Sequence, residues 1–332
     1  MIISRTPFRV SFFGGGTDYP QWFRENGGAV LATSINKYCY ISCRYLPPFF
    51  EHKHRIVYSR IENVREISEI QHPAVRSVLD VLKCNRGLEI HHDGDLPARS
   101  GLGSSSSFTV GLINALMALT GKHISSEELA RKAIHIEQNV IKENVGSQDQ
   151  ILAAYGGFNK IEFLNNGEFR VSPIILDADR VAQLESRLML FFTGFSRTAS
   201  EIAKSQIDNF KSHINEMRAM RDMVDEAVAI LHSENGALSD FGRLLHDSWL
   251  YKRSLSSRIS SQAIDDIYES AKKAGASGGK LLGAGGGGFL LLFVEPEAQI
   301  AVRQQLRNLV QVPFRFEISG SRIVLYQPGG LG

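Results

Sequence analysis

The sequence predicts an α+β protein with two domains, on three observations. Strand-like segments dominate residues 1–45, whereas residues 200–274 show helical periodicity almost throughout. Near the end, the apolar run Phe289–Val294, a helix around Ala298–Leu309 and a strand around Phe314–Ile318 would form a β-α-β unit. Strand-rich and helix-rich segments that are separated along a chain are typical of α+β proteins.

Length and composition predict an ordinary globular protein. The 332 residues are 43% hydrophobic and 22% charged, enough for one large or two medium domains. We place a boundary near residue 180, giving domains 1–180 and 181–332. The formal net charge of +2 gives no support for a nucleic-acid or membrane partner. Three cysteines without a C-x-x-C pair indicate neither a disulfide framework nor a zinc site. Apolar runs of strand length and no signal-peptide pattern favour the cytoplasm.

The first part of the chain alternates strands with turns. Phe8, Val10 and Phe12 predict a strand that ends at the glycine turn 14–16. The further elements expected up to residue 92 are strands at Ala29–Ser34, Lys37–Arg44, Arg55–Ser59 and Leu88–His92, and a helix at Pro73–Leu82.

The stretch Leu96–Ser107 reads L-P-A-R-S-G-L-G-S-S-S-S and predicts an anion site. It lies between a strand and the apolar segment Phe108–Leu119, which predicts a buried helix. The first N–H groups of such a helix have no intrahelical partners, and its dipole is positive there. Gly101 and Gly103 allow close backbone approach, so a phosphate site is favoured. The alternative is an ordinary helix start capped by one serine.

Helices dominate the later part. Ser125–Glu128 resembles a capping box that opens a helix with Leu129, Ala133 and Ile136 on one face. Ser200–His232 is helical throughout but long for one helix, so we expect a bend or a break. The remaining expected elements are strands at Phe158–Phe163, Glu168–Ile175 and Leu188–Thr193 and helices at Phe241–Leu255 and Gln262–Ala274.

Two glycine runs resemble nucleotide-binding motifs but lack their context. Gly283, Gly285 and Gly288 fit G-x-G-x-x-G, yet a strand follows where that motif opens a helix. The run at residues 14–16 lacks its third glycine because Tyr19 occupies the position. The Leu96–Ser107 turn is followed by no Lys-Ser/Thr pair, so the Walker motif is absent as well. A dehydrogenase is therefore disfavoured.

Four charged residues could serve phosphoryl transfer, which needs a metal ligand, an oriented acceptor hydroxyl and cations near the phosphates. Asp18 directly follows the first glycine turn, and Arg9 lies within an apolar strand. Glu137 could bind Mg²⁺ and Asp149 could act as base. Their alternatives are an outward-facing strand residue for Arg9, a solvated helix face for Glu137 and a helix N-cap for Asp149.

Three segments resemble, in order and spacing, the motifs of the GHMP kinase superfamily: Thr6–Pro20, Leu96–Ser107 and Leu281–Phe289. The similarity implies an ATP-dependent small-molecule kinase with the GHMP kinase fold, which has a ribosomal protein S5 domain 2-like N-terminal domain and a ferredoxin-like C-terminal domain. G-G-G-T-D-Y and the Gly/Ser turn are most similar to the D-glycero-D-manno-heptose 7-phosphate kinases. That resemblance implies phosphorylation of an anomeric hydroxyl to give a 1,7-bisphosphate for nucleotide-heptose and surface-glycan synthesis.

The resemblance also implies roles for single residues. Asp149 matches the catalytic aspartate and Arg9 the cation near the transferred phosphoryl, and Ser105 and Glu137 resemble the Mg²⁺ ligands. The ATP phosphates would bind to Pro97, Arg99, Ser100, Gly101, Leu102, Gly103, Ser104, Ser105 and Ser106. The sugar would bind to Gly15, Gly16, Thr17, Asp18, Tyr19, Arg197, Gly285, Gly286 and Gly287.

The motifs depart from those of the galactokinases at one informative place. Gly15 and Gly16 replace a glutamate and a histidine, which widens the pocket and removes a carboxylate that would repel a phosphorylated sugar. Arg99, Arg197, Lys53 and Arg44 are candidate partners for that phosphate. Two alternatives stay open, a sugar-1-kinase for a free hexose or 6-deoxyhexose such as fucose or galactose, and a non-catalytic sensor of sugar and ATP. The sequence leaves monomer and dimer equally open.

Overall fold

The computed structural model describes residues 1–98, 100–194, 199–233 and 236–329, and it contains two antiparallel-rich sheets. The larger sheet has the strand order β12-β1-β2-β5-β3-β4, and β6 joins β2 to β7 on a branch. Its strands are β1 (Ile2–Phe13), β2 (Gly28–Tyr45), β3 (His54–Val57), β4 (Ile61–Val64), β5 (Leu88–Gly94), β6 (Phe158–Phe163), β7 (Phe169–Pro173) and β12 (Arg322–Tyr326).

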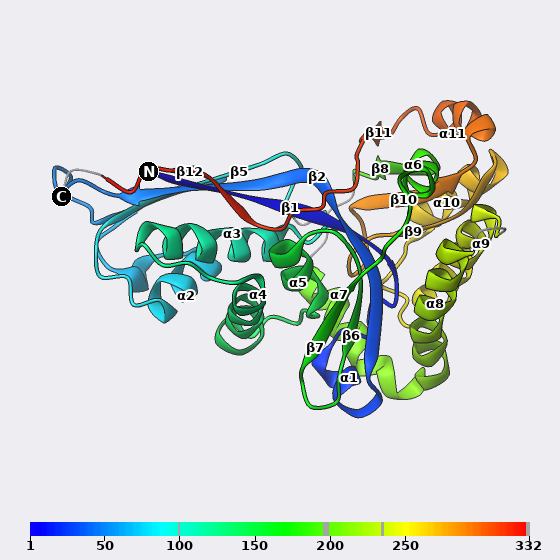
Figure 1. Ribbon diagram of the computed structural model, residues 1–332, viewed down its shortest axis with the longest axis horizontal. Coiled ribbons are helices and arrows are strands. Elements are labelled where there is room, and N and C mark those ends of the chain that lie inside the picture. Colours follow the sequence, from blue (N-terminus) through cyan, green and yellow to red (C-terminus); the bar gives the residue numbers. More distant parts are fainter. Residues whose placement is uncertain (99, 195–198, 234–235, 330–332) are drawn as a thin grey trace.

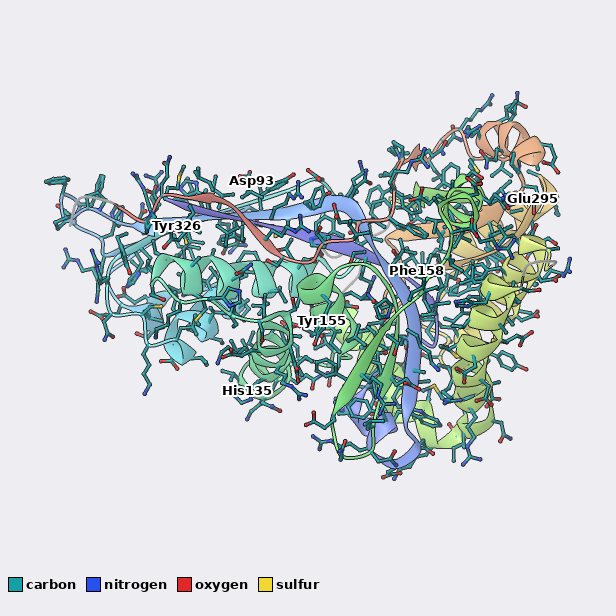
Figure 2. The ribbon with its side chains drawn as sticks, in the orientation of Figure 1. Asp93, His135, Tyr155, Phe158, Glu295 and Tyr326 are labelled. Carbon is teal, nitrogen blue, oxygen red and sulfur yellow. The ribbon has the colours of Figure 1, made fainter. Side chains whose placement is uncertain are left out.

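Helices cover one face of this sheet (Figure 1). The central one, α3, packs on β1 and β2, and His135 of α4 projects on the side away from Asp93 of β5 (Figure 2). The helices of this half are α1 (Pro20–Asn26), α2 (Pro73–Val81), α3 (Ser104–Leu119), α4 (Ser126–His135) and α5 (Gln148–Tyr155). Most of α3 is buried, which confirms the buried helix predicted after the Gly/Ser turn.

The second sheet has the strand order β11-β8-β10-β9 and belongs to the other half of the molecule. Its strands are β8 (Leu188–Phe192), β9 (Ala276–Leu281), β10 (Phe289–Val294) and β11 (Val310–Gln311). Its helices are α6 (Ala178–Ser186), α7 (Ala199–Asn209), α8 (Ile214–His232), α9 (Leu238–Ser254), α10 (Gln262–Lys273) and α11 (Gln299–Gln305). The expected break in Ser200–His232 is confirmed, because a short 3₁₀ turn at Phe210–Ser212 separates α7 from α8.

The strands differ from the expectation at three places. Ala29–Ser34 and Lys37–Arg44 form one continuous strand, β2, that pairs with β1 throughout despite two shifts in register. Phe314–Ile318 is not a strand, although Phe316 makes a single bridge to Ile35. β9 was not predicted, because its glycines carry no strand pattern and instead allow close packing. A Cβ on Gly278 would lie 1.9 Å from the Gly242 carbonyl oxygen, so α9 lies directly against the β9 backbone.

The last strand returns to the N-terminal sheet. β12 pairs antiparallel with β1, with Ile2 opposite Tyr326 and Arg5 opposite Arg322. The boundary at residue 180 remains a prediction, but a division at that point assigns β12 to the half of the molecule that does not contain its partner strand.

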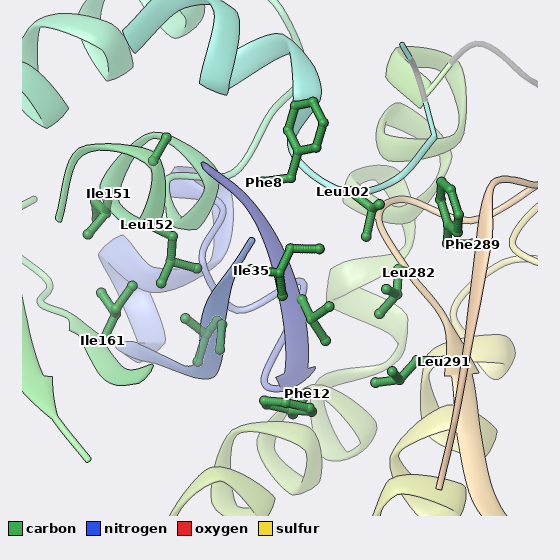
Figure 3. Close-up of a cluster of buried hydrophobic side chains, with 14 of the residues drawn as sticks. Phe8, Phe12, Ile35, Leu102, Ile151, Leu152, Ile161, Leu282, Phe289 and Leu291 are labelled. Atoms are coloured by element: carbon green, nitrogen blue, oxygen red, sulfur yellow. The ribbon is translucent and has the colours of Figure 1, made fainter. Parts of the chain in front are cut away.

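Aromatic side chains pack where the two halves meet. Phe12 of β1 makes edge-to-face contacts with Phe241 of α9, at a centroid distance of 5.5 Å, and with Phe158 of β6 at 5.7 Å. Nearby, Leu102, Leu282 and Phe289 are also buried, and they bring the Gly/Ser turn and the glycine-rich loop into one core (Figure 3). Burial of apolar surface therefore fixes how the two halves sit together.

Phe241→Ala is expected to lower the free energy of unfolding by about 3–5 kcal/mol, because it leaves a cavity beside Phe12 and Phe13. Urea denaturation monitored by circular dichroism measures the loss. Phe49→Ala is the control, since Phe49 is 77% exposed and should change the midpoint little. Equal midpoints for the two variants would contradict the role of this core.

Candidate active site

The start of α3 is open, as an anion site requires. The helix begins at Ser104 after Gly103, which has left-handed backbone angles (φ 75°, ψ 23°) and no capping side chain. A serine cap, the alternative interpretation of this stretch, is therefore not what the structure has. The positive end of the helix dipole lies at this start, which is where phosphate oxygens are favoured.

The glycine-rich loop between β9 and β10 packs backbone to backbone against this turn. A Cβ on Gly101 would lie 2.4 Å from the Leu282 carbonyl oxygen, and one on Gly283 would lie 2.5 Å from the Gly101 Cα. The Phe289 N–H donates to the Ser100 carbonyl over 3.1 Å. The structure thus brings together two of the motifs that the sequence singled out, residues 96–107 and 281–289.

The rest of the glycine-rich loop is held from the C-terminal half. The Gly286 N–H donates to the Ile259 carbonyl over 2.8 Å, and the Gln206 side chain donates to the Ala284 carbonyl. Gly285 and Gly287 both have positive φ angles, 111° and 154°. The three glycines predicted to bind substrate therefore lie in a loop that is fixed at its base.

Arg9 and Asp149 form a bidentate ion pair beside the turn. The Arg9 Nε and Nη2 atoms each donate to one carboxylate oxygen of Asp149 over 2.8 Å, and Nη1 donates to the Gly101 carbonyl over 2.6 Å. A Cβ on Gly103 would lie 3.3 Å from both the Arg9 Cγ and an Asp149 carboxylate oxygen. Two parallel hydrogen bonds fix the orientation of the carboxylate as well as its position.

The alternative interpretations of this pair are wrong. Arg9 is only 4% exposed, so it is not an outward-facing strand residue. Asp149 lies in the first turn of α5, whose N-cap is Ser147, so it is not a helix cap. Its side chain is about one quarter exposed, and the carboxylate is therefore reachable by a substrate.

Asp18 is buried and holds the segment that carries Asp149. Its carboxylate accepts from the Gly16 N–H over 2.9 Å and the Gln148 N–H over 3.3 Å, and its carbonyl accepts from the Ser147 N–H. A Cβ on Gly146 would lie 1.9 Å from an Asp18 carboxylate oxygen. Burial raises the pKa of Asp18, partly offset by the N–H donors. The structure thus shows Asp18 as a brace for the 146–149 segment.

The side chains of Thr17 and Tyr19, next to Asp18, are held by the fold, whereas Gly15 borders buried polar side chains. The Thr17 hydroxyl donates to the Gly14 and Ala29 carbonyls, and the ring of Tyr19 packs on Phe210, so both side chains are engaged by the fold. A Cβ on Gly15 would lie 3.6 Å from the Ser11 hydroxyl oxygen and 3.8 Å from the Gln148 side-chain nitrogen, so Gly15 borders two buried polar side chains. The Ser11 hydroxyl and the Gln148 side-chain carbonyl have no hydrogen-bond partner among the described residues.

Glu137 is buried, and the expectation of a solvated helix face was wrong. It is 1% exposed and lies in a π-helical turn, Ile136–Ile141, a feature that often marks functional sites. One carboxylate oxygen accepts from the Ser106 hydroxyl, over 2.8 Å, and from the Gln150 side chain, while the other is buried without a hydrogen-bond partner. Burial raises its pKa to about 7. Ser105, the predicted metal ligand, is exposed on the helix, so the hydroxyl beside Glu137 is that of Ser106.

Two of the four candidate partners for a sugar phosphate, Arg44 and Lys53, do not lie near this site. Arg44 forms an ion pair with Glu89. Arg44 lies ten residues along β2 from Ser34, which is the residue that pairs with Arg9. At about 3.3 Å per residue, this separation is roughly 30 Å. Lys53 lies in the same distal region, where its N–H pairs with Val64. Arg99 and Arg197, and with them part of the segment 193–197, fall outside the described residues.

Two buried lysines were missed by sequence reasoning. Lys252 of α9 donates to the Gly283 carbonyl, and Lys280 of β9 donates to the Phe12 carbonyl over 2.7 Å. They are 5% and 1% exposed, in a chain whose lysines are otherwise mostly at the surface. Lys280 directly precedes the glycine-rich loop, in a strand that was not predicted. Its place next to that motif was the only sequence signal for its burial.

Comparison with known proteins identifies the family. The GHMP kinases N-terminal domain matches residues 69–157, and the GHMP kinases C-terminal domain matches residues 227–311. A D-glycero-alpha-D-manno-heptose 7-phosphate kinase of Campylobacter jejuni is 31% identical over 322 residues, which is 92% of this chain and 93% of that protein.

Solved structures agree. A D-glycero-D-manno-heptose 1-phosphate kinase from Bacteroides thetaiotaomicron matches with a TM-score of 0.79 at 25% identity, over 97% of this chain and 98% of that one. A galactokinase of Lactococcus lactis complexed with galactose shares the fold, with a TM-score of 0.74 at 19% identity over 97% and 94% of the two chains.

The fold and site define an ATP-dependent small-molecule kinase, in which a helix start without a side-chain cap lies beside an arginine–aspartate pair. The chain belongs to the GHMP kinase family and has its two-domain fold, as the resemblance implied. Within the described residues, no helix combines the length and apolar character needed to cross a membrane.

Arg9→Lys is expected to lower kcat roughly 10- to 100-fold with little change in thermal stability, because one ammonium cannot replace the two parallel bonds to Asp149 and the bond to Gly101. Steady-state ADP release measures kcat. Arg44→Lys, which alters an arginine–glutamate pair at the far end of the same sheet, is the matched control. A similar small effect for both variants would refute the role of Arg9.

Proposed function

We propose that this kinase phosphorylates the anomeric hydroxyl of a heptose phosphate, with D-glycero-D-manno-heptose 7-phosphate as the substrate and the 1,7-bisphosphate as the product. The observation that carries the chemistry is the Asp149 carboxylate, fixed by Arg9 next to Gly103 at the start of α3. The heptose assignment rests on the Campylobacter jejuni relative and on Gly15 and Gly16, which stand where galactokinases carry a glutamate and a histidine.

The residues suggest a division of labour. The N–H groups at the start of α3 and the turn 96–106 bind the ATP phosphates, and the glycine-rich loop covers them. Asp149 orients the acceptor hydroxyl and accepts its proton while the oxygen bonds to the γ-phosphorus and the bond to ADP breaks. Arg9 holds the carboxylate toward the acceptor and stabilises charge on the transferred phosphoryl.

Glu137 and a turn serine suit Mg²⁺. Carboxylate and hydroxyl oxygens are its usual protein ligands, and one Glu137 oxygen is buried without a hydrogen-bond partner. Among the described residues no group of three or more His, Cys, Asp or Glu could hold a metal, so phosphate oxygens would complete the shell. When bound there, Mg²⁺ would neutralise charge on the ATP phosphates. The reaction needs ATP and a sugar phosphate, and we therefore place it in the cytoplasm.

A free-sugar kinase is the second candidate. A bifunctional fucokinase/GDP-fucose pyrophosphorylase of Arabidopsis thaliana is 26% identical over 91% of this chain. The two candidates differ in whether the acceptor carries a phosphate. ADP release should be screened over free and phosphorylated hexoses and heptoses, followed by phosphorus NMR of the product. ADP formed only with free sugars would overturn the heptose phosphate assignment.

Asp149→Asn is expected to lower kcat by ~10²-fold or more and to leave the fold intact, because the amide cannot accept the proton of the acceptor hydroxyl. ADP release and thermal melting measure the two effects. Asp177→Asn, at the N-cap of α6, is the control, since asparagine caps a helix as well as aspartate does. Near-normal turnover of the Asp149 variant would exclude its role as base.

Glu137→Gln is expected to raise the Mg²⁺ concentration for half-maximal activity by ~10-fold or more, since it removes a charged ligand. Ser105→Ala and Ser106→Ala then decide which hydroxyl takes part, by the same titration. Ser107→Ala is the control, because the Ser107 hydroxyl donates to the Pro7 carbonyl instead. Superimposable Mg²⁺ curves for all four variants and the unaltered enzyme would place the metal elsewhere.

A further inference from the structure

The Walker lysine that many ATP-binding loops use is absent from this phosphate turn, and the C-terminal half offers a replacement. Lys252 is buried in α9, and its ammonium donates to the Gly283 carbonyl. Gly283 packs directly on Gly101, and the Gly101 carbonyl accepts from Arg9 over 2.6 Å. Lys252 and Arg9 therefore hold the two sides of one backbone contact, one from each half of the molecule.

We propose that Lys252 and Arg9 together bind a terminal phosphate group at the contact between Gly101 and Gly283. The binding of a phosphate by these two residues does not depend on the proposed function. Only its use in phosphoryl transfer rests on that function. The same chemistry could come from the γ-phosphate of ATP or from a phosphate on the acceptor, and the experiment below separates the two.

The hydrogen bonding of the Lys252 ammonium supports the binding of an anion. An ammonium has three N–H donors, and among the described residues the structure pairs Lys252 with the Gly283 carbonyl alone. A buried charged donor that lacks partners is costly, so such groups are normally paired. Phosphate oxygens would supply acceptors for the remaining donors.

The charges around Lys252 point the same way. The groups that act on it are Arg9 from β1, Asp18 from the first glycine turn, Asp149 from α5 and Lys280 from β9. These are three cations, Lys252 included, against two carboxylates. Burial disfavours the charged forms of Asp18 and of Lys280, which leaves Arg9 and Lys252 against Asp149. A buried excess of positive charge is stabilised when an anion binds.

Lys252→Met tests the proposal by binding, without any sugar. ATP and ADP affinities are measured by titration calorimetry. If Lys252 binds the γ-phosphate, the variant should bind ATP roughly 10- to 100-fold more weakly and ADP almost normally. If it binds an acceptor phosphate, nucleotide affinities should be unchanged, while KM should rise for phosphorylated sugars only. Lys252→Arg, which keeps the charge, should restore part of the loss.

Lys272→Met is the matched control. Lys272 also lies in the C-terminal half and also donates to a backbone carbonyl, that of Ser277 over 2.7 Å, but on α10. Both variants lose such a bond, so a loss of stability common to both reports only the structural role. Thermal melting separates that loss from an effect on phosphate binding.

The pH profile gives a readout that a purely structural bond would not change. Burial lowers the pKa of Lys252 to about 8. Because a lysine loses its charge as the pH rises through its pKa, kcat/KM should fall above about pH 8, and this limb should be absent in Lys252→Met. Unchanged ATP, ADP and sugar-phosphate affinities together with an unchanged limb would overturn the proposal and leave Lys252 as a structural tie.

Discussion

The site depends on one close approach, that of Gly101 in the phosphate turn to Gly283 in the glycine-rich loop. A side chain on either residue would collide with the backbone of the other half. Both glycines have positive φ angles, a conformation that other residues rarely adopt. Because the two backbones touch, the start of α3 lies against a loop that is anchored through Ile259, Gln206 and Lys252. Loss of this contact would separate the Gly/Ser turn from the glycine-rich loop.

The second constraint is the chain of polar contacts behind Asp149. Asp18 accepts from the segment 146–148, which sets the start of α5, and α5 presents Asp149 to Arg9. Arg9 also holds the Gly/Ser turn through its backbone N–H, which donates to the Leu102 carbonyl over 3.1 Å. The carboxylates of Asp18 and Asp149 are therefore arranged in series, the first as a brace for the segment that carries the second. Charge that is fixed before substrate binds needs no rearrangement during the reaction.

Local sequence patterns were sufficient to predict those elements whose burial follows from their own apolar residues. The buried helix α3 and the break after α7 follow from apolar periodicity and from the length of the helical segment. Burial of single polar residues did not follow, because it depends on neighbours distant in sequence. Glu137 lies in a segment with charged residues on both sides, and only the tertiary fold shows that Ser106 and Gln150 surround it. Lys252 was missed because its burial also depends on distant neighbours. β9 was missed because packing through glycines leaves no hydrophobic pattern to detect.

The pairing of β12 with β1 has a consequence for how the chain folds during synthesis. β1 is made long before β12, yet one of its two edges pairs only with residues 322–326. Until the ribosome has released that segment, β1 presents unpaired N–H and C=O groups on this side, which is the kind of edge that pairs with other chains. The N-terminal sheet therefore cannot mature before the C-terminal half has been translated, and its closure requires a contact of very high sequence separation, which is intrinsically slow to form. A nascent chain stalled before residue 322 would carry a complete phosphate turn on an incomplete sheet.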